Sequence, residues 1–189
     1  AEVLLAHVLN RPRVYLHTWP EAELSQEQEA RFSDMIRQRA AGQPVAYLTG
    51  QREFWSLNFA VTPDSLIPRP ETELLVERTL ALLTENKTLR VADLGTGSGA
   101  VAIALAHERR YWRLYAIDQS LKCVKLAQGN ARRLNVDNLC FINADWSTAL
   151  ADRSFDAIVS NPPYVADQDP HLQQGDVCFE PASALTAGP

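Results

Sequence analysis

The chain has 189 residues, of which 46% are hydrophobic and 22% are charged, and its formal net charge is −5 at pH 7. This composition excludes a disordered protein, because disordered chains are poor in apolar residues. The chain has no apolar run near the roughly 18 residues of a membrane-spanning helix, and it has no basic segment, which argues against binding nucleic acid through its phosphates.

The front of the chain, residues 1–48, predicts a small helical unit. Apolar residues in 2–9 recur with a helical period. After the breaker-rich stretch 10–20, Ser25 followed by Gln28 has the pattern of a capping box, which predicts a second helix. Composition does not decide whether this unit is a structural appendage or has a docking function.

A hairpin and another helix are predicted next. Residues 52–62 place aromatic and β-branched residues around a short polar break, which is typical of a β-hairpin, and we assign 49–66 to a hairpin linker. Pro70 then suits the first position of a helix, and Glu71 suits its electropositive first turn. The apolar faces of this helix would contain Leu74, Leu75, Leu80, Leu82 and Leu83.

From residue 89 onward, short apolar strands alternate with helices, which is typical of a parallel sheet in an α/β fold. We therefore expect a Rossmann-like domain over 67–189, with helices covering both faces of its sheet. The strands are predicted at 89–94, 114–117, 139–142 and 155–159, and the helices at 100–107 and 121–134.

A glycine-rich turn follows the first of these strands, in the sequence VADLGTGSGAVAIALA. Gly95, Gly97 and Gly99 permit positive φ angles and a close approach of a ligand to the backbone. Such a turn alone could serve NAD, FAD or S-adenosylmethionine. Its G-x-G-x-G spacing departs from the dinucleotide pattern G-x-G-x-x-G, so we expect the turn to lie against a methionine moiety.

Acidic and aromatic residues follow the next two strands. Asp118 ends the second strand 23 positions after Gly95, where it can accept hydrogen bonds from ribose hydroxyls. Asp145 follows the third strand and can accept from an exocyclic amine, and Trp146 offers a flat face for adenine. Together with the glycine turn, these residues predict a nucleoside-type cofactor site.

The sequence IVSNPPYV follows the fourth predicted strand and contains the candidate catalytic residues. Asn161 has an amide oxygen that accepts hydrogen bonds, and Pro162 and Pro163 hold their carbonyl groups rigidly. These acceptors suit the two hydrogens of a planar –NH2 group, with Tyr164 packed on its plane. We therefore predict methyl transfer to an amide or amino nitrogen, with orientation of its lone pair as the main catalytic task.

Neither the cysteines nor the histidines have the spacing of metal ligands. Cys123, Cys140 and Cys178 are expected to be reduced and buried, as in a cytosolic protein. We therefore predict no metal site and a cytoplasmic location.

DLGTGSG, the strand-ending Asp118, NADW and NPPY occur in the order found in class I S-adenosylmethionine-dependent methyltransferases. The segments YLTGQREFWSL, LIPRPETE and NPPYVADQDPHLQQGDVCFEP resemble the HemK/PrmC family more narrowly. That family methylates the side-chain amide of the glutamine in the GGQ motif of peptide chain release factors.

The resemblance implies a site as well as an activity. Asn161 to Tyr164 would hold the substrate glutamine, with Asn161 also beside the cofactor, and the front helical domain would dock class 1 release factors. We expect a monomer that does not bind nucleic acid directly. The methionine part of the cofactor would be lined by Gly95, Thr96, Gly97, Ser98 and Gly99, and the cleft would be bordered by Arg69, Pro70 and Glu71.

Two alternatives and one departure remain at this point. The first alternative is a nucleic-acid methyltransferase acting on adenine or guanine, whose members share an NPPY-like loop but need a base-flipping pocket. The second is a cofactor-binding interaction protein whose NPPY loop is inert. The departure concerns both ends of the chain. A class I fold has seven strands where four are predicted, and the front is short of the family's first helix, so we expect an incomplete chain.

Overall fold

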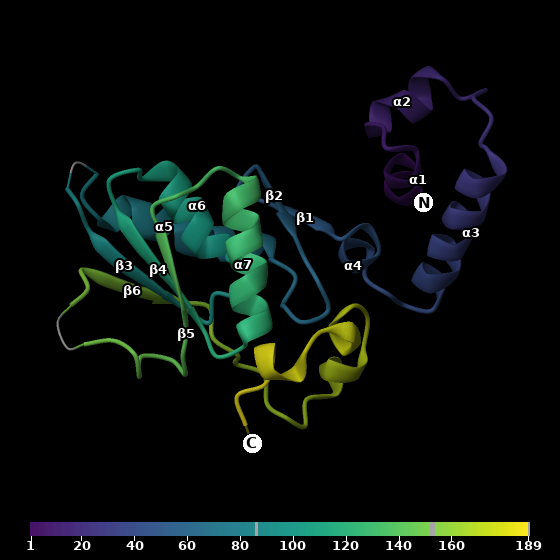
Figure 1. Ribbon diagram of the computed structural model, residues 1–189. Coiled ribbons are helices and arrows are strands. Elements are labelled where there is room, and N and C mark those ends of the chain that lie inside the picture. Colours follow the sequence, from purple (N-terminus) through teal and green to yellow (C-terminus); the bar gives the residue numbers. More distant parts are fainter. Residues whose placement is uncertain (86, 152–153, 189) are drawn as a thin grey trace. The chain divides into compact units, whose positions relative to one another are not determined.

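The computed structural model describes residues 1–85, 87–151 and 154–188. The chain folds into two compact units. The first contains residues 1–50 and 171–179, and the second contains 51–170 and the residues from 180 onward (Figure 1).

The first unit is helical, as predicted. It contains α1 (Glu2–Leu9), α2 (Arg13–Thr18), α3 (Gln26–Ala40) and α4 (Val45–Thr49). The capping box is confirmed, because Ser25 Oγ accepts from the Gln28 backbone N–H at 3.2 Å and Gln28 Oε1 accepts from the Ser25 N–H at 2.9 Å.

Helix α2 lies inside the breaker-rich stretch 10–20, where the sequence analysis predicted no helix. Pro12 stands immediately before α2 with a φ of −65°. A proline at this end of a helix removes no intrahelical hydrogen bond, since the first N–H groups of a helix have no partner within it. Pro12 therefore starts a helix rather than preventing one.

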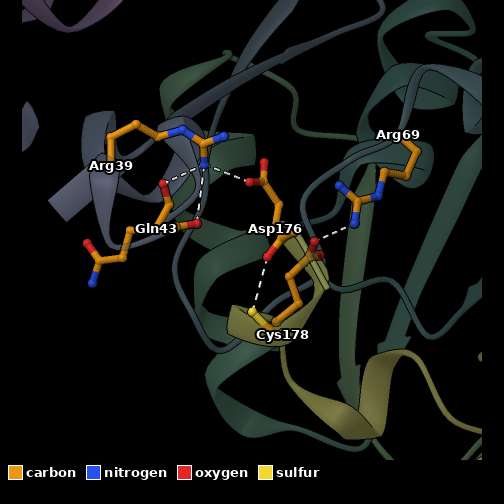
Figure 2. A network of polar contacts seen from close by, with 8 residues as sticks. Arg39, Gln43, Arg69, Asp176 and Cys178 are labelled. Carbon is orange, nitrogen blue, oxygen red and sulfur yellow. Dashed lines mark hydrogen bonds and ion pairs between the residues drawn. The ribbon is translucent and has the colours of Figure 1, made fainter. Parts of the chain in front are cut away.

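Residues 171–179 join the first unit through the C-terminal end of α3. Arg39 Nη1 donates to the carbonyl oxygens of Gly42 and Gln43 at 3.2 and 2.9 Å and to Asp176 Oδ1 at 2.7 Å (Figure 2). The ring of Phe179 packs so closely that a Cβ atom on Gly42 would lie 3.0 Å from it. A segment distant in sequence thus completes the helical unit.

The predicted hairpin is confirmed as the antiparallel pair β1 (Gln51–Phe54) and β2 (Leu57–Ala60). The two turn residues, Trp55 and Ser56, have φ angles of 53° and 57°, as in a type I′ turn. Phe54 and Phe59 are buried in the core of the second unit. The hairpin is therefore part of that core as well as a connection.

Segment 66–83 begins extended and then becomes helical. Arg69 is extended, Pro70–Thr72 form a 3-10 turn (η1), and α5 spans Glu73–Leu82. The face of α5 toward the core includes Val76, Leu75 and Leu80. Leu74 and Leu82 were expected on an apolar face too, but their side chains are 54% and 81% exposed.

The alternating strands and helices form a parallel sheet, as predicted, in the order β5-β4-β3-β6. Its edge strand β6 pairs with β3, where the chain reverses its direction of travel across the sheet. The elements are β3 (Arg90–Leu94), α6 (Ala100–Glu108), β4 (Arg113–Asp118), α7 (Leu121–Arg133), β5 (Leu139–Asn143) and β6 (Ala157–Ser160).

The expectation of helices on both faces of the sheet is wrong for the described residues. Alternate strand residues, Val91, Leu114 and Val159 among them, share one core with α5, α6 and α7. On the opposite face, Cys140 is exposed and Ile158 is 55% exposed. The crossovers from β3 to β4 and from β4 to β5 run in the same direction with the same hand, so both place their helices on one face.

The cysteine prediction holds only for Cys123, which is buried, whereas Cys140 and Cys178 are exposed. Cys140 lies on the uncovered face of the sheet, and Cys178 lies in the short 3-10 turn η3 (Val177–Phe179). Within the described ranges, no helix is long and apolar enough to cross a membrane, and no group of three potential metal ligands is found.

Candidate functional site

A pocket lies at the carboxyl ends of the strands, the edge at which parallel sheets bind ligands. It is lined by residues following all four strands and by segment 64–72. Ten residues that the sequence predicted for the site line it, namely Arg69, Gly95, Thr96, Gly97, Ser98, Asp118, Asp145, Trp146, Asn161 and Pro163. Five others do not, namely Pro70, Glu71, Gly99, Pro162 and Tyr164.

The glycine turn is open toward this pocket. Gly95 and Gly97 have φ angles of 74° and 56°, and a Cβ atom on either would meet nothing within 4 Å. The N–H groups of Gly95 and Thr96 both donate to the Ile117 carbonyl at 2.9 Å, which fixes the turn against β4. A ligand can therefore lie directly on the backbone of this turn.

Gly99 has a packing position instead. Its φ is 84°, and a Cβ atom there would lie 2.9 Å from both Ala127 Cβ and Ile103 Cδ1. Glycine at this position lets the start of α6 approach α7 closely. Gly99 therefore serves the packing of α6 against α7 and does not line the pocket.

Asp93, which the sequence analysis did not single out, also supports the turn. Its side chain is buried, and Oδ2 accepts from Thr96 Oγ1 at 2.6 Å. Burial raises the pKa of Asp93 from 3.8 to about 6, although the hydrogen bond from Thr96 opposes this shift. The sequence signal that could have identified Asp93 is its position two residues before the first glycine of the turn.

Asp118 joins the turn to the end of β4. Its Oδ2 accepts from the Gly97 N–H and its Oδ1 accepts from the Ser120 N–H, each at 2.8 Å. Since a carboxylate oxygen has two lone pairs, both oxygens can still accept from ribose hydroxyls. Asp118 therefore fits its predicted position and also holds the turn in shape.

Asn130 is a supporting residue that sequence reasoning missed. It is fully buried on α7, where Nδ2 donates to the carbonyls of Ala60 and Ser98 at 2.9 Å and Oδ1 accepts from the Ala60 N–H at 2.8 Å. This one side chain ties β2 to the glycine turn. The sequence signal that could have identified Asn130 is an amide side chain beside Ala127 and Ala131 on the apolar face of a helix.

Asp145 and Trp146 form a wall of the pocket beyond β5. Trp146 has a φ of 46° and is 44% exposed, so its ring is available to a ligand. The Asp145 carbonyl accepts from Thr148 Oγ1 at 2.7 Å, which stabilises the turn that presents both side chains.

Only part of the NPPY loop, among the described residues, lines the pocket. Asn161 and Pro163 line it, whereas Tyr164 is 79% exposed. The backbone N–H groups of Tyr164 and Val165 donate to the Leu185 carbonyl at 3.2 and 3.0 Å. The loop is thus held by the chain that follows it.

Charge in the pocket favours a cationic ligand. Among the described lining residues, Arg69 is the one cation, against the four carboxylates of Asp64, Asp93, Asp118 and Asp145. S-adenosylmethionine carries a sulfonium cation, a ribose and an adenine, for which the pocket offers carboxylates, backbone and an aromatic face. The residues present therefore fit this cofactor.

The fold and the site define a methyltransferase. Residues 70–186 match the family model described as methyltransferase small domain. The catalytic domain of hMettl16, solved in complex with an RNA hairpin, has the same fold, with a TM-score of 0.57 at 21% identity over 82% of this chain and 58% of that one. A methyltransferase from Agrobacterium tumefaciens is also similar, with a TM-score of 0.51 at 18% identity over 60% and 39% of the two chains.

Comparison of sequences identifies a more specific family than comparison of folds does. Residues 1–50 match the PrmC N-terminal domain. Release factor glutamine methyltransferases from Shewanella oneidensis and Escherichia coli are 52% and 50% identical over 99% of this chain, which spans 65% and 67% of their own lengths. The chain belongs to the release factor glutamine methyltransferase family.

Proposed function

We propose that the full-length protein transfers a methyl group from S-adenosylmethionine to the side-chain amide nitrogen, N5, of the glutamine in the GGQ motif of class 1 release factors. One observation carries this proposal: identity of about 50% to release factor glutamine methyltransferases extends along 99% of the chain, through every segment of the pocket.

The cofactor site follows from the pocket. Gly95, Gly97 and the residues between them would receive the methionine part, and Asp118 the ribose hydroxyls. Asp145 would accept from the adenine amine and Trp146 would stack on its ring. When bound, S-adenosylmethionine supplies an electrophilic methyl group on a sulfonium centre.

The chain's own contribution to transfer is orientation. The nitrogen of an amide is weakly nucleophilic because its lone pair is delocalised. Asn161 Oδ1 and the Pro162 carbonyl would accept the two amide hydrogens, and Tyr164 would pack on the amide plane. This arrangement directs the nitrogen at the methyl group. The methylated nitrogen would be cationic and strongly acidic, so it would lose one N–H proton to water, and no strong general base is needed.

The helical front, residues 1–48, would dock the body of the release factor, and the protein would act as a cytoplasmic monomer without binding nucleic acid directly. Deletion of residues 1–48 should then leave S-adenosylmethionine binding nearly intact and abolish methylation of the whole release factor. Transfer to a short GGQ peptide should fall far less. Equal losses on the peptide and the protein would show that the helices only support the fold.

The deciding experiment compares acceptors. Full-length protein and labelled S-adenosylmethionine are incubated with release factor, RNA or DNA, and the site of methylation is read by mass spectrometry. We expect methyl glutamine in the GGQ peptide and no methylated base. Methylated adenine or guanine would favour a nucleic-acid enzyme, and no transfer to any acceptor would favour an interaction protein.

A further inference from the structure

A buried carboxylate anchors the wall of the pocket that faces the NPPY loop. Glu180 belongs to the segment after the NPPY loop, and its side chain is fully buried. Its Oε2 accepts from the Ile67 N–H at 3.0 Å, and its Oε1 forms an ion pair with the guanidinium of Arg69, which Figure 2 labels. Glu180 therefore fixes two residues of segment 66–72 at once.

That segment lines the same pocket as Asn161. Leu66, Pro68, Arg69 and Thr72 all line the pocket. Thr72 also touches the proposed catalytic amide, because Asn161 Nδ2 donates to Thr72 Oγ1 at 3.5 Å. With Nδ2 directed at Thr72, the other side of the planar amide presents Oδ1, the atom required to accept from substrate.

We propose that Glu180 is a positioning residue for Asn161, and that Thr72 transmits its effect. Glu180 holds segment 66–72 in place, and Thr72 then fixes the plane of the Asn161 amide. This inference rests on the proposed function, because it assumes that Asn161 orients the substrate nitrogen. Glu180 is buried and does not belong to the described residues that line the pocket, which assigns it to support rather than to binding.

The first test uses Glu180→Gln in the full-length protein. Glutamine keeps an acceptor for the Ile67 N–H but loses the charge that holds Arg69. We expect single-turnover methylation at saturating release factor and cofactor to fall by about tenfold, the factor equivalent to one ordinary hydrogen bond. Glu85→Gln is the matched control, since it removes the Arg109–Glu85 ion pair of the same unit, neither residue of which lines the pocket, and it should leave the rate unchanged.

The second test substitutes Thr72 and leaves the buried carboxylate of Glu180 unchanged. Thr72→Val removes the hydroxyl at nearly constant volume, and Thr72→Ser retains it. We expect the valine variant to lose about tenfold in transfer rate while its affinity for S-adenosylmethionine stays within a small factor, and we expect the serine variant to recover. Thr79→Val on the following helix, α5, removes a hydroxyl that donates to the Leu75 carbonyl and does not line the pocket, and it should transfer at the wild-type rate.

Double variants decide whether the effect passes through Asn161. In an Asn161→Ala background, Glu180→Gln and Thr72→Val should each add less than twofold, because the group that they position is gone. Full, additive losses in that background, or wild-type transfer by both single variants, would overturn the positioning role alone. Absence of glutamine methylation by the wild-type protein would instead overturn the proposed function.

Discussion

Substitution of Gly99 by alanine provides a sharp test of the packing beneath the cofactor turn. The backbone at Gly99 has a φ of 84°, and a Cβ atom would lie 2.9 Å from Ala127 Cβ and Ile103 Cδ1. Gly97 has a similar left-handed φ of 56°, but a Cβ atom there would meet nothing within 4 Å. The two glycines therefore share the conformational cost of alanine and differ in the steric cost.

The magnitudes follow from these contacts. A left-handed alanine costs about 1–2 kcal/mol, and the lower entropy of the unfolded alanine chain returns about 0.4–1 kcal/mol. Overpacking against Ala127 and Ile103 adds about 1–3 kcal/mol for Gly99→Ala only. We therefore expect Gly97→Ala to destabilise by about 1 kcal/mol and Gly99→Ala by about 2–4 kcal/mol in total.

The assay is urea unfolding of the full-length protein and both variants, combined with calorimetry of S-adenosylmethionine binding. Gly97→Ala should weaken cofactor binding more than Gly99→Ala, because its new methyl group stands on the pocket side of the turn. Equal destabilisation by the two substitutions would refute the packing position of Gly99.

Three further predictions concern two carboxylates of the pocket and the three thiols of the chain. Asp118→Ala should weaken S-adenosylmethionine binding by about 1–3 kcal/mol, with a smaller loss for Asp118→Asn, and unchanged affinity in calorimetry would reject the ribose contact. The raised pKa of Asp93, about 6 against an ordinary 3.8, means that the folded state binds its proton more tightly than the unfolded state does. Its contribution to folding is thus largest at low pH and is lost as the pH rises from about 4 to 6. The stability of wild type relative to Asp93→Asn should therefore fall by about 2 kcal/mol between pH 4 and 7, and a flat difference would contradict this. Because burial raises the pKa of the Cys123 thiol, iodoacetamide should label Cys140 and Cys178 first at pH 8, and peptide mapping that found Cys123 labelled as quickly would contradict its burial.

Local patterns in the sequence were sufficient for the strands, for the longer helices and for most of the pocket, but they did not predict α2 or α4. The capping box at Ser25, the hairpin in 52–62 and the glycine turn depend on neighbouring residues, so they could be recognised without the fold, whereas the type I′ turn at Trp55 and Ser56 could not. Asp118, Asp145 and Asn161 each follow a strand of a parallel sheet, and the carboxyl ends of such strands meet at one edge. Their convergence on one pocket could therefore be predicted from the order of the elements.

Tertiary structure alone decided which residues support that pocket. Asn130 and Glu180 act on backbone 70 and 113 positions away, and no local pattern specifies such partners. The same holds for Gly99, where a side chain does not fit because α6 packs closely against α7. Helix coverage of the sheet depended on the direction of successive crossovers, which periodicity does not encode. Local hydrogen bonding and hydrophobic period are properties of the sequence, whereas long-range packing exists only once the chain has folded.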